Sequence, residues 1–364
     1  MLTALQLLSA LWIIPFLLLE AAGIVGILTG ERKKRVSGEP RVSFLVAAWK
    51  EGHRIRKCVD SILGQRYPRS KISVLVIGGG DKETVGVCKK LSSEGKITYL
   101  EEKKRSGKWF ALNRGLRKAG GEYVAFTDAD CMLEKDWLAK MLRADADMVI
   151  ADVYSTSEKS FYGKMYAYVW HLTLRVSEGL NFFLKTGEFM GQGSLVKKKV
   201  FNRLRFEESF VEDWRLNYKA KRAGFSSAHS TAKTYEYMPG SFNDFRKAGL
   251  RTMKGLITEI SQIRDPLSLA IIVMSAAALI SVPFHAYLIL TGDAFGLLAL
   301  FLLVIFTAFF SFVSSVRRGN YRFILYAPLV IPIVILFFAY ATETAVRLLL
   351  KKEISWEIYG KKEK

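Results

Sequence analysis

The feature that most constrains this chain is the length of its apolar segments, which lie near both ends. Leu2–Leu28 is apolar almost throughout, and three more apolar runs follow late in the chain: Leu267–Leu290, Phe295–Val316 and one that starts at Phe323. About 20 consecutive apolar residues are enough for a helix to cross a bilayer. The runs therefore predict an integral protein of the cell membrane and exclude a disordered chain, which would lack such hydrophobicity.

Basic residues beside the runs predict their orientation. Arg32–Arg35 follow the first run directly, and Arg317 and Arg318 follow the third. Because Lys and Arg concentrate on the cytoplasmic side, the middle of the chain is expected to face the cytoplasm. A cleavable secretory signal is the competing interpretation, but its apolar core would span only about 7–15 residues. The basic cluster after the run favours a retained anchor.

The last apolar run has a less regular composition. Two prolines and two charged residues interrupt it: Pro328, Pro332, Glu343 and Arg347. A charge at the bilayer centre costs about 2.5–3.5 kcal/mol on insertion scales, so we interpret Thr342–Lys352 as an interfacial amphipathic helix. Residues 323–341 either span the bilayer, which would place the basic tail outside, or bend back at the prolines as a re-entrant segment. The second interpretation is slightly favoured.

The charge balance indicates what kind of surface the chain meets. It has 54 Lys and Arg against 34 Asp and Glu, a formal charge of +20. Basic proteins often bind nucleic acid, but juxtamembrane basic residues also bind anionic lipid head groups. The apolar runs favour lipid, and no nucleic-acid partner is expected. The three cysteines, Cys58, Cys88 and Cys131, have no metal-binding spacing and suit a reducing compartment.

The middle of the chain alternates between strand-like and helix-like segments. The expected strands are Val42–Ala48, Ile72–Ile77, Ile97–Leu100 and Glu122–Thr127, and the expected helices are His53–Gln65, Lys82–Leu91 and Trp109–Lys118. Such alternation predicts an α/β domain with a parallel sheet covered on both faces. The expected organisation is an anchor (1–30), a cytoplasmic α/β domain (31–240), an amphipathic interface segment (241–265), transmembrane or re-entrant helices (266–350) and a basic tail (351–364).

Ligands of open parallel sheets collect beyond the carboxyl ends of the strands. Asp128 and Asp130 follow the fourth strand, where two carboxylates suit Mg²⁺ or Mn²⁺ bridging to phosphates, although both could instead cap the helix near Glu134. Lys108 begins a helix, where backbone amides already favour anions, although its basic neighbours also fit a solvated turn. No Gly-x-Gly-x-x-Gly or P-loop motif follows a strand, which argues against a Rossmann dinucleotide site and a P-loop.

Two further segments allow two interpretations each. Gly78–Gly80 permit a nucleotide base to approach the backbone closely, or simply form a turn. Glu212 and Asp213 precede the helical run Arg215–Arg222, where they would either cap the helix or supply a general base for a hydroxyl nucleophile. His229 is a possible extra metal ligand, but a lone histidine is more often structural.

Taken in order, these segments resemble the membrane-anchored branch of the family 2 glycosyltransferases, with a glycosyltransferase A-type fold. The matching segments are VSFLVAAWKE (42–51), RSGKWFALNRG (105–115), FTDAD (126–130), GQGSLVKK (191–198) and VEDW (211–214). The resemblance implies a mixed, mainly parallel sheet with flanking helices, a nucleotide diphosphate-sugar donor and a divalent cation.

The resemblance also implies roles for individual residues. Asp213 would be the catalytic base and Asp130 would hold the metal. The nucleotide-sugar side would comprise Ala47, Glu51, Asp81, Lys108, Asp128 and Arg251, and the acceptor side Gly191, Gln192, Gly193, Glu212 and Trp214.

The chain departs from the family pattern at two places. Gly78–Thr84 replaces the usual acidic end of the second strand, so the base-contacting acid is Asp81 or is absent. Processive members carry Gln-x-x-Arg-Trp near the membrane, and here only Arg251 remains. We therefore expect inverting, metal-dependent transfer of a sugar to a lipid-linked acceptor at the cytoplasmic face. The alternatives are a polysaccharide synthase and a catalytically inactive nucleotide-sugar-binding subunit.

Overall fold

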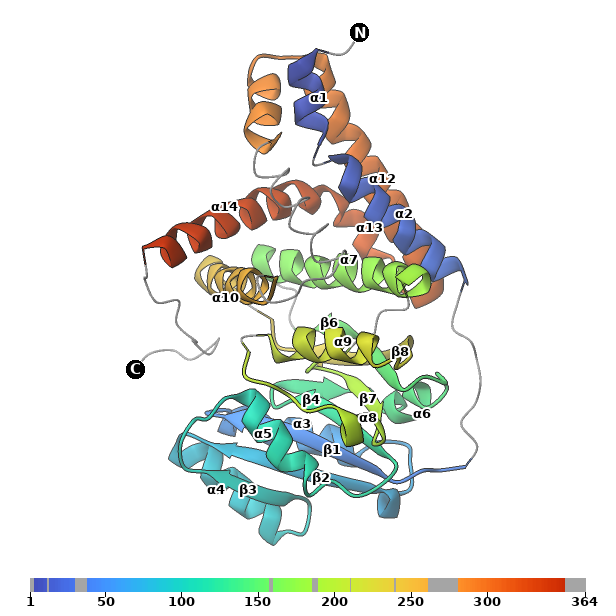
Figure 1. Cartoon of the computed structure of the whole chain (residues 1–364). Helices are drawn as coiled ribbons and strands as arrows, with labels where there is room; N and C mark the ends of the chain where they lie inside the picture. The colour runs from blue at the N-terminus through green and yellow to red at the C-terminus, as the bar shows by residue number, and fades with distance from the viewer. Residues whose placement is uncertain are drawn as a thin grey trace. The chain divides into compact units, whose positions relative to one another are not determined.

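The computed structural model of the chain describes residues 3–11, 13–29, 38–156, 160–184, 189–209, 211–238, 240–260 and 281–350 (Figure 1). Its contacts divide the chain into two compact units. The sheet unit comprises Gly30–Thr156 and Leu184–Met238, and the helical unit comprises Met1–Thr29, Ser157–Phe183 and Pro239–Lys364. Each unit is described by itself.

The described part of the sheet unit contains one eight-stranded sheet in the order β3-β2-β1-β4-β7-β6-β8-β5. Its strands are β1 (Val42–Trp49), β2 (Ile72–Gly79), β3 (Thr98–Glu102), β4 (Tyr123–Asp128), β5 (Cys131–Leu133), β6 (Met148–Ser155), β7 (Ser194–Lys197) and β8 (Ser227–Glu236). Strands β3, β2, β1 and β4 are parallel neighbours, as are β6 and β8. The β4–β7, β6–β7 and β5–β8 pairs are antiparallel, which confirms the expected mixed, mainly parallel sheet.

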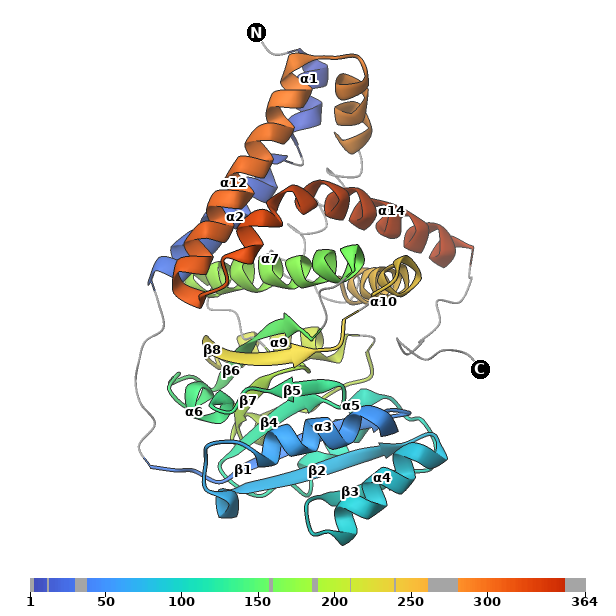
Figure 2. The ribbon, with the colours of Figure 1, turned by 180° about the vertical axis from the view of Figure 1, so that it is seen from behind.

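Helices cover both faces of this sheet (Figures 1 and 2). They are α3 (Gly52–Leu63), α4 (Lys82–Ser93), α5 (Lys108–Leu116), α6 (Trp137–Met141), α8 (Val200–Arg203) and α9 (Glu212–Arg222), with a 3-10 turn at Arg69–Lys71. The first four expected strands and three expected helices are all present, with ends that differ by no more than a few residues. The four later strands, β5 to β8, were not among the expected ones.

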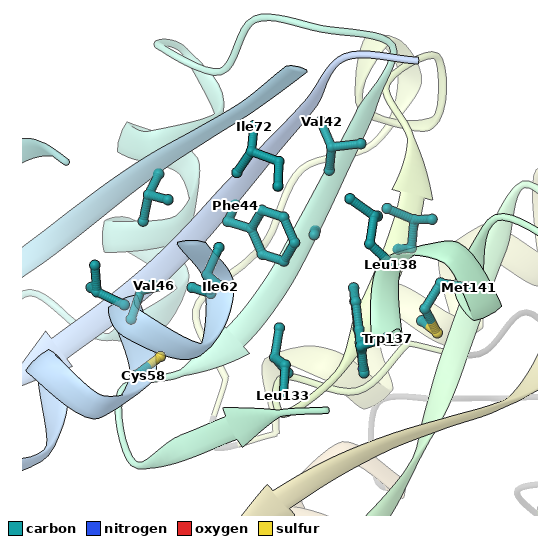
Figure 3. Close-up of a cluster of buried hydrophobic side chains, with 14 of the residues drawn as sticks. Val42, Phe44, Val46, Cys58, Ile62, Ile72, Leu133, Trp137, Leu138 and Met141 are labelled. Carbon is teal, nitrogen blue, oxygen red and sulfur yellow. The ribbon is translucent and has the colours of Figure 1, made fainter. Parts of the chain in front are cut away.

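The alternation of side chains along β1 explains the two-faced core. Val42, Phe44 and Val46 point to one face, where they pack with residues of α3 and α6 such as Ile62 and Trp137 (Figure 3). The intervening residues, such as Leu45, pack against α5 on the opposite face. Because successive strand residues point to opposite faces, a strand buried on both sides has to be apolar throughout.

The helical unit contains the apolar segments predicted to cross a membrane. Its helices are α1 (Ala4–Ala10), α2 (Ile13–Thr29), α7 (Phe161–Leu184), α10 (Phe242–Ile260), a helix at Ser281–Leu290, α12 (Ala294–Arg318), α13 (Arg322–Leu325), a 3-10 turn at Ala327–Leu329 and α14 (Val330–Leu349). Within the described residues, three segments are long and apolar enough to span a bilayer: Ala4–Thr29, Ala294–Arg318 and Ala327–Leu349. Most of the run Leu267–Leu290 and the basic tail 351–364 lie outside the described residues.

Helix α7 differs from the expected division of the chain, which placed it within the 31–240 domain. Here it packs with the apolar helices. A β-carbon on Gly26 of α2 would lie 2.4 Å from the α-carbon of Gly179, so these two helices approach as closely as backbones allow. Polar pairs join α7 to α12: Tyr168 and Ser311 hydroxyls lie 2.8 Å apart, and His171 Nε2 lies 3.0 Å from Ser314 Oγ.

The prolines of the last run stand at the start of α14 rather than within it. Pro328 lies in the 3-10 turn, and Pro332 is the third residue of a helix that continues to Leu349. A proline in the first helical turn sacrifices no intrahelical hydrogen bond, since the amides there have no partner anyway. The charge of Glu343 is paired with Arg246 of α10 and with Arg347, whose Nη2 lies 2.7 Å from Glu343 Oε1.

Within the described residues, the amphipathic interface segment expected at 241–265 contains α10, which begins at Phe242. Tyr235, which precedes this helix in the sequence, belongs to β8. Tyr235 pairs with Met132 in the β5–β8 ladder.

Candidate active site

The carboxyl ends of three neighbouring parallel strands meet at one edge of the sheet. Ala47 of β1 lies opposite Asp128 of β4, and Trp49 lies opposite Gly79 of β2. Parallel pairing therefore brings together loops that are far apart in the sequence. The residues predicted to act on a ligand, apart from Arg251, belong to this unit.

Lys108 is the centre of one group of charges, which we call the lysine cluster: Lys108, Asp128, Glu212 and Asp213. Its Nζ lies 2.6 Å from Asp128 Oδ1 and 3.5 Å from Glu212 Oε1. Burial disfavours the charged ammonium, but Asp128 and Glu212 outweigh burial and raise the pKa of Lys108 above its ordinary value. Lys108 is therefore a fixed positive charge at the first residue of α5, as its sequence position predicted.

The two acids at the start of α9 are held in a state that favours proton exchange. Glu212 is only 7% exposed, and its burial raises its pKa to about 7, although Lys108 opposes the rise. Burial also raises the pKa of Asp213 above its ordinary value, again against the attraction of Lys108. The Trp214 backbone amide donates a hydrogen bond of 2.9 Å to Asp213 Oδ1 and orients that carboxylate. A carboxylate with a raised pKa is a stronger base near neutral pH.

Gly191 lies directly against the lysine cluster. A β-carbon there would lie 2.4 Å from Lys108 Nζ and 3.6 Å from Asp128 Oδ2, so a side chain would displace the ammonium. Gly193 is similarly confined, 2.6 Å from Thr234 Oγ1 by the same measure. These contacts explain sterically why glycine, which has no side chain, stands at both positions of the predicted acceptor-side segment. Gln192, between them, is half-buried.

A second group, the arginine cluster, comprises Arg54, Glu51, Asp130 and Tyr237. Arg54 Nη1 lies 3.4 Å from Glu51 Oε2 and 3.8 Å from Asp130 Oδ2, and its guanidinium carbon lies 4.2 Å from the centre of the Tyr237 ring. Burial and then the charge of Asp128 raise the pKa of Asp130 to about 6, while Arg54 opposes the rise. Asp128 and Asp130 thus connect the two clusters.

Sequence reasoning did not identify Arg54 or Tyr237 as site residues. The Glu51–Arg54 spacing of three residues was a usable signal, since oppositely charged residues at that spacing meet on a helix. Tyr237 gave no local signal, because it reaches Arg54 only through the course of β8.

Asp128 and Asp130 provide a chemically suitable but incomplete set of ligands for a divalent cation. Mg²⁺ and similar hard cations commonly take one or two carboxylates and complete their coordination with substrate phosphates and water. No group of three or more His, Cys, Asp or Glu side chains within the described ranges could hold a metal by itself. The pair therefore fits a cation that binds together with a diphosphate. His229, buried in β8 opposite Ile150, belongs to no such group.

The turn that carries the two aspartates rests on buried thiols. Cys58 Sγ donates to the Asp128 carbonyl oxygen at 3.4 Å, and Cys131 Sγ lies 3.8 Å from Asp130 Oδ1. Burial raises the pKa of both thiols above the ordinary value. Both therefore remain neutral and act as small packing groups.

The structure explains why glycine stands at the end of β2 and directly after it. A β-carbon on Gly78 would lie 1.7 Å from the Ala48 carbonyl oxygen, and Gly80 has a φ of +95° with the Trp49 ring packed on it. Asp81 caps α4 by accepting a hydrogen bond of 2.8 Å from the Thr84 amide. Its contact with a base stays a prediction. Arg251 lies on α10 in the helical unit, so its role also stays a prediction.

Comparison with known proteins now defines the class of this domain. Residues 43–205 match the glycosyl transferase family 2, so the chain contains a family 2 glycosyltransferase domain. This interval includes Glu51, Lys108, Asp128, Asp130 and the glycine pair at 191 and 193, and it ends before Glu212. The resemblance found in the sequence motifs is thereby confirmed.

Individual relatives agree with that class. The chain is 28% identical over 201 residues to the glycosyltransferase GlyA of Streptococcus pneumoniae, a match covering 50% of this chain and 28% of that protein. It is 31% identical over 103 residues to the glycosyltransferase AglE of Haloferax volcanii, covering 28% of this chain and 34% of that protein. The chain thus spans only about a third of the length of these two relatives.

A solved structure shares the overall fold. The mannosyltransferase PcManGT from Pyrobaculum calidifontis, determined in complex with GDP-Man and Mn²⁺, is 20% identical, with a TM-score of 0.57. The match covers 95% of this chain and 100% of that one. At this identity the likeness shows the fold, which is the glycosyltransferase A type expected from the sequence.

Proposed function

We propose that the chain is a membrane-bound, inverting glycosyltransferase that moves a sugar from a nucleotide diphosphate-sugar to a lipid-linked acceptor at the cytoplasmic face. The observation that carries the proposal is the convergence of Lys108, Asp128 and Glu212 at the strand ends of a family 2 domain. The three apolar segments support a membrane location and hence a lipid acceptor. The basic residues 32–35 and 317–318 support the cytoplasmic orientation.

In the proposed reaction the acceptor oxygen forms a bond to the anomeric carbon as the bond to the diphosphate breaks. Asp213 takes the proton of the acceptor hydroxyl, a contribution of about 10²–10⁴-fold in known cases. If the acceptor is a lipid phosphate, which is already ionised, Asp213 positions it instead. Glu212, Trp214 and the 191–193 segment would form the acceptor side.

The departing nucleoside diphosphate gains negative charge, which fixed positive groups stabilise. Lys108 supplies one such charge, and Arg251 is proposed to supply another. Asp130, with Asp128 beside it, would hold Mg²⁺ or Mn²⁺, which neutralises the diphosphate oxygens when bound. Removing one preorganised group of this kind costs about 2.7–4 kcal/mol in known enzymes. The Mn²⁺ in the PcManGT structure supports the choice of cation to test first.

The test is a transfer assay on the full chain in lipid nanodiscs, with GDP- and UDP-sugars and extracted membrane lipids. We expect a single sugar on a lipid, an inverted anomeric configuration and loss of turnover with a chelator. Asp130→Ala should abolish metal-dependent turnover while thermal unfolding stays unchanged, and Asp136→Asn is the matched control, since that exposed acid pairs with Arg66.

Each other outcome of this assay has a defined meaning. A long glycan on a gel would replace the proposal with a polysaccharide synthase. Binding of nucleotide-sugar without transfer or hydrolysis would indicate an inactive binding subunit. Full activity of Asp130→Ala would overturn the metal assignment.

A further inference from the structure

The arginine cluster places a permanent cation beside the proposed metal ligand. Arg54, in the first turn of α3, lies 3.8 Å from Asp130 Oδ2 and 3.4 Å from Glu51 Oε2. Glu51 precedes the helix and makes no side-chain hydrogen bond that caps it. A guanidinium cannot lose its charge in a protein. Asp130 therefore has a permanently positive neighbour.

The Arg54 contacts with Glu51 and Asp130 are longer than the contact between Lys108 and Asp128. Charge-assisted hydrogen bonds between nitrogen and a carboxylate are usually about 2.7–2.9 Å long. Lys108 is at least this close to Asp128, at 2.6 Å, whereas the distances from Arg54 to Glu51 and Asp130 are longer. The guanidinium is nevertheless held in place, because it stacks on the Tyr237 ring at 4.2 Å. Such a group is able to leave a carboxylate without losing its other support.

A divalent cation and Arg54 would compete for the same carboxylate. Bringing a second positive charge next to Asp130 creates repulsion that weakens metal binding. A diphosphate changes this balance, because its negative charge offsets the repulsion and offers the guanidinium an acceptor that arginine binds well. Metal and nucleotide should then each increase the affinity for the other, since coupling between two ligands is reciprocal.

We propose that Arg54 is a resident counter-ion of the Asp128/Asp130 pair, which keeps metal affinity low until a nucleoside diphosphate arrives. Arg54 is thus a positioning residue that couples the two ligands. The inference rests on the proposed function, because it requires a nucleotide diphosphate as the second ligand. Its consequence is that free metal does not occupy the site without donor.

The experiment measures Mn²⁺ binding to the full chain in nanodiscs, from the electron paramagnetic resonance signal of free Mn²⁺. Titrations are made without nucleotide and with saturating GDP or UDP, so no turnover is involved. In the wild type we expect nucleotide to increase Mn²⁺ affinity. Arg54→Gln should bind Mn²⁺ alone about tenfold more tightly, within the usual range of coupling, and should lose most of the nucleotide effect.

Matched variants separate this role from a structural one. Arg56→Gln removes the same charge from the same helix, but Arg56 pairs with Glu94, so wild-type Mn²⁺ binding is expected. Arg54→Lys should restore the low affinity in the absence of nucleotide. Tyr237→Leu, which removes the ring but keeps the charge, should fall between wild type and Arg54→Gln. It also provides a second measurement if Arg54→Gln does not fold.

Unchanged or weaker Mn²⁺ binding by Arg54→Gln, with a nucleotide effect in the wild type, would overturn this inference and leave the proposed function standing. If wild-type Mn²⁺ affinity does not respond to either nucleotide, and neither nucleotide binds, the donor proposal and this inference both fail. Tighter binding by Arg56→Gln as well as Arg54→Gln would reduce the effect to overall charge and also overturn the inference.

Discussion

The lysine cluster and the arginine cluster lie at the same edge of one sheet, yet they arrange charge differently. Lys108 has three acids around it, and burial raises the pKa values of Glu212 and Asp213 toward neutral pH. Arg54 has two acids and an aromatic ring, and its own charge cannot change. The first arrangement suits proton transfer, and the second suits the exchange of one cation for another.

This difference explains why a site of this kind uses two separate cations, Lys108 and Arg54, at one edge of the sheet. A base must gain and lose a proton during the reaction, so its neighbours have to tolerate both charge states. A diphosphate site must tolerate a large change in charge when ligand arrives. Asp128 belongs to the lysine cluster and Asp130, two residues later, to the arginine cluster. Proton transfer and diphosphate binding would therefore take place side by side but with different residues.

The largest expected effect comes from removing the base of the lysine cluster. Asp213→Asn keeps the shape of the side chain but removes the base, so kcat should fall by about 10²–10⁴-fold. Nucleotide-sugar binding, measured by calorimetry, should remain near wild type because the arginine cluster is intact. Asp136→Asn should change neither quantity. Loss of donor binding in Asp213→Asn would show that the two clusters are not separable.

The next largest effect is expected from removing the positive charge of Lys108, which the three acids surround. Lys108→Gln should lower kcat by about 10²–10³-fold, by analogy with the removal of one transition-state donor. It should also destabilise the protein by about 1–3 kcal/mol, less than for a fully buried pair, because Lys108 is 28% exposed.

A double variant gives the control for this prediction. Lys108→Gln with Glu212→Gln removes both the cation and one of the acids it left unpaired. Thermal unfolding of the double variant should therefore recover part of the lost stability, while activity stays low. If the double variant is no more stable than Lys108→Gln, the pairing of Lys108 with Glu212 contributes nothing to the fold.

A smaller effect tests how closely the acceptor-side segment limits the lysine. Gly191→Ala would bring a β-carbon to 2.4 Å from Lys108 Nζ, a flexible group that is able to move. We expect little loss of stability but about a tenfold fall in kcat/KM, because the ammonium leaves its optimum position. Gly86→Ala is the control, since nothing lies within 4 Å of that position. Equal activity of both variants would contradict the assigned contact.

The extent to which sequence predicts this site differs between the clusters for a physical reason. Lys108, Asp128 and the strand ends follow from apolar runs and from parallel pairing, which forces carboxyl ends to one edge. Arg54 meets Tyr237, which follows β8, and β8 is placed by its pairing with β6 and with β5, a strand of three residues with no detectable pattern. Contacts set by long-range pairing of short strands leave no local signal.

The same limit applies to the helices. The apolar runs were recognisable by their length. That α7 belongs to the helical unit depends instead on tertiary contacts, those of Gly179 in α7 with α2 and of Ser311 in α12 with α7. Pro332 was expected to interrupt a helix and instead stands in its first turn. A proline inside a helix kinks or breaks it, whereas a proline in the first turn is tolerated. The position of a proline relative to the helix start therefore decides whether the helix continues.

The smallest expected effect concerns the dependence of stability on pH. Glu212 has a folded pKa of about 7, above its ordinary value of 4.5, because burial disfavours its charge. The stability linked to its protonated form is fully present below pH 4.5 and is lost as the pH rises through about 7. Glu212→Gln cannot ionise, so its stability relative to wild type should increase over that interval.

We expect the gain of Glu212→Gln to reach about 1 kcal/mol at pH 8, because the lost attraction to Lys108 offsets part of the relief. Thermal unfolding of both proteins at intervals between pH 4.5 and 8 measures the difference. Glu207→Gln, at an exposed acid of the preceding loop, should give a profile parallel to wild type. A constant difference between Glu212→Gln and wild type would mean that Glu212 stays ionised, and the lysine cluster would then resemble the arginine cluster in holding fixed charges only.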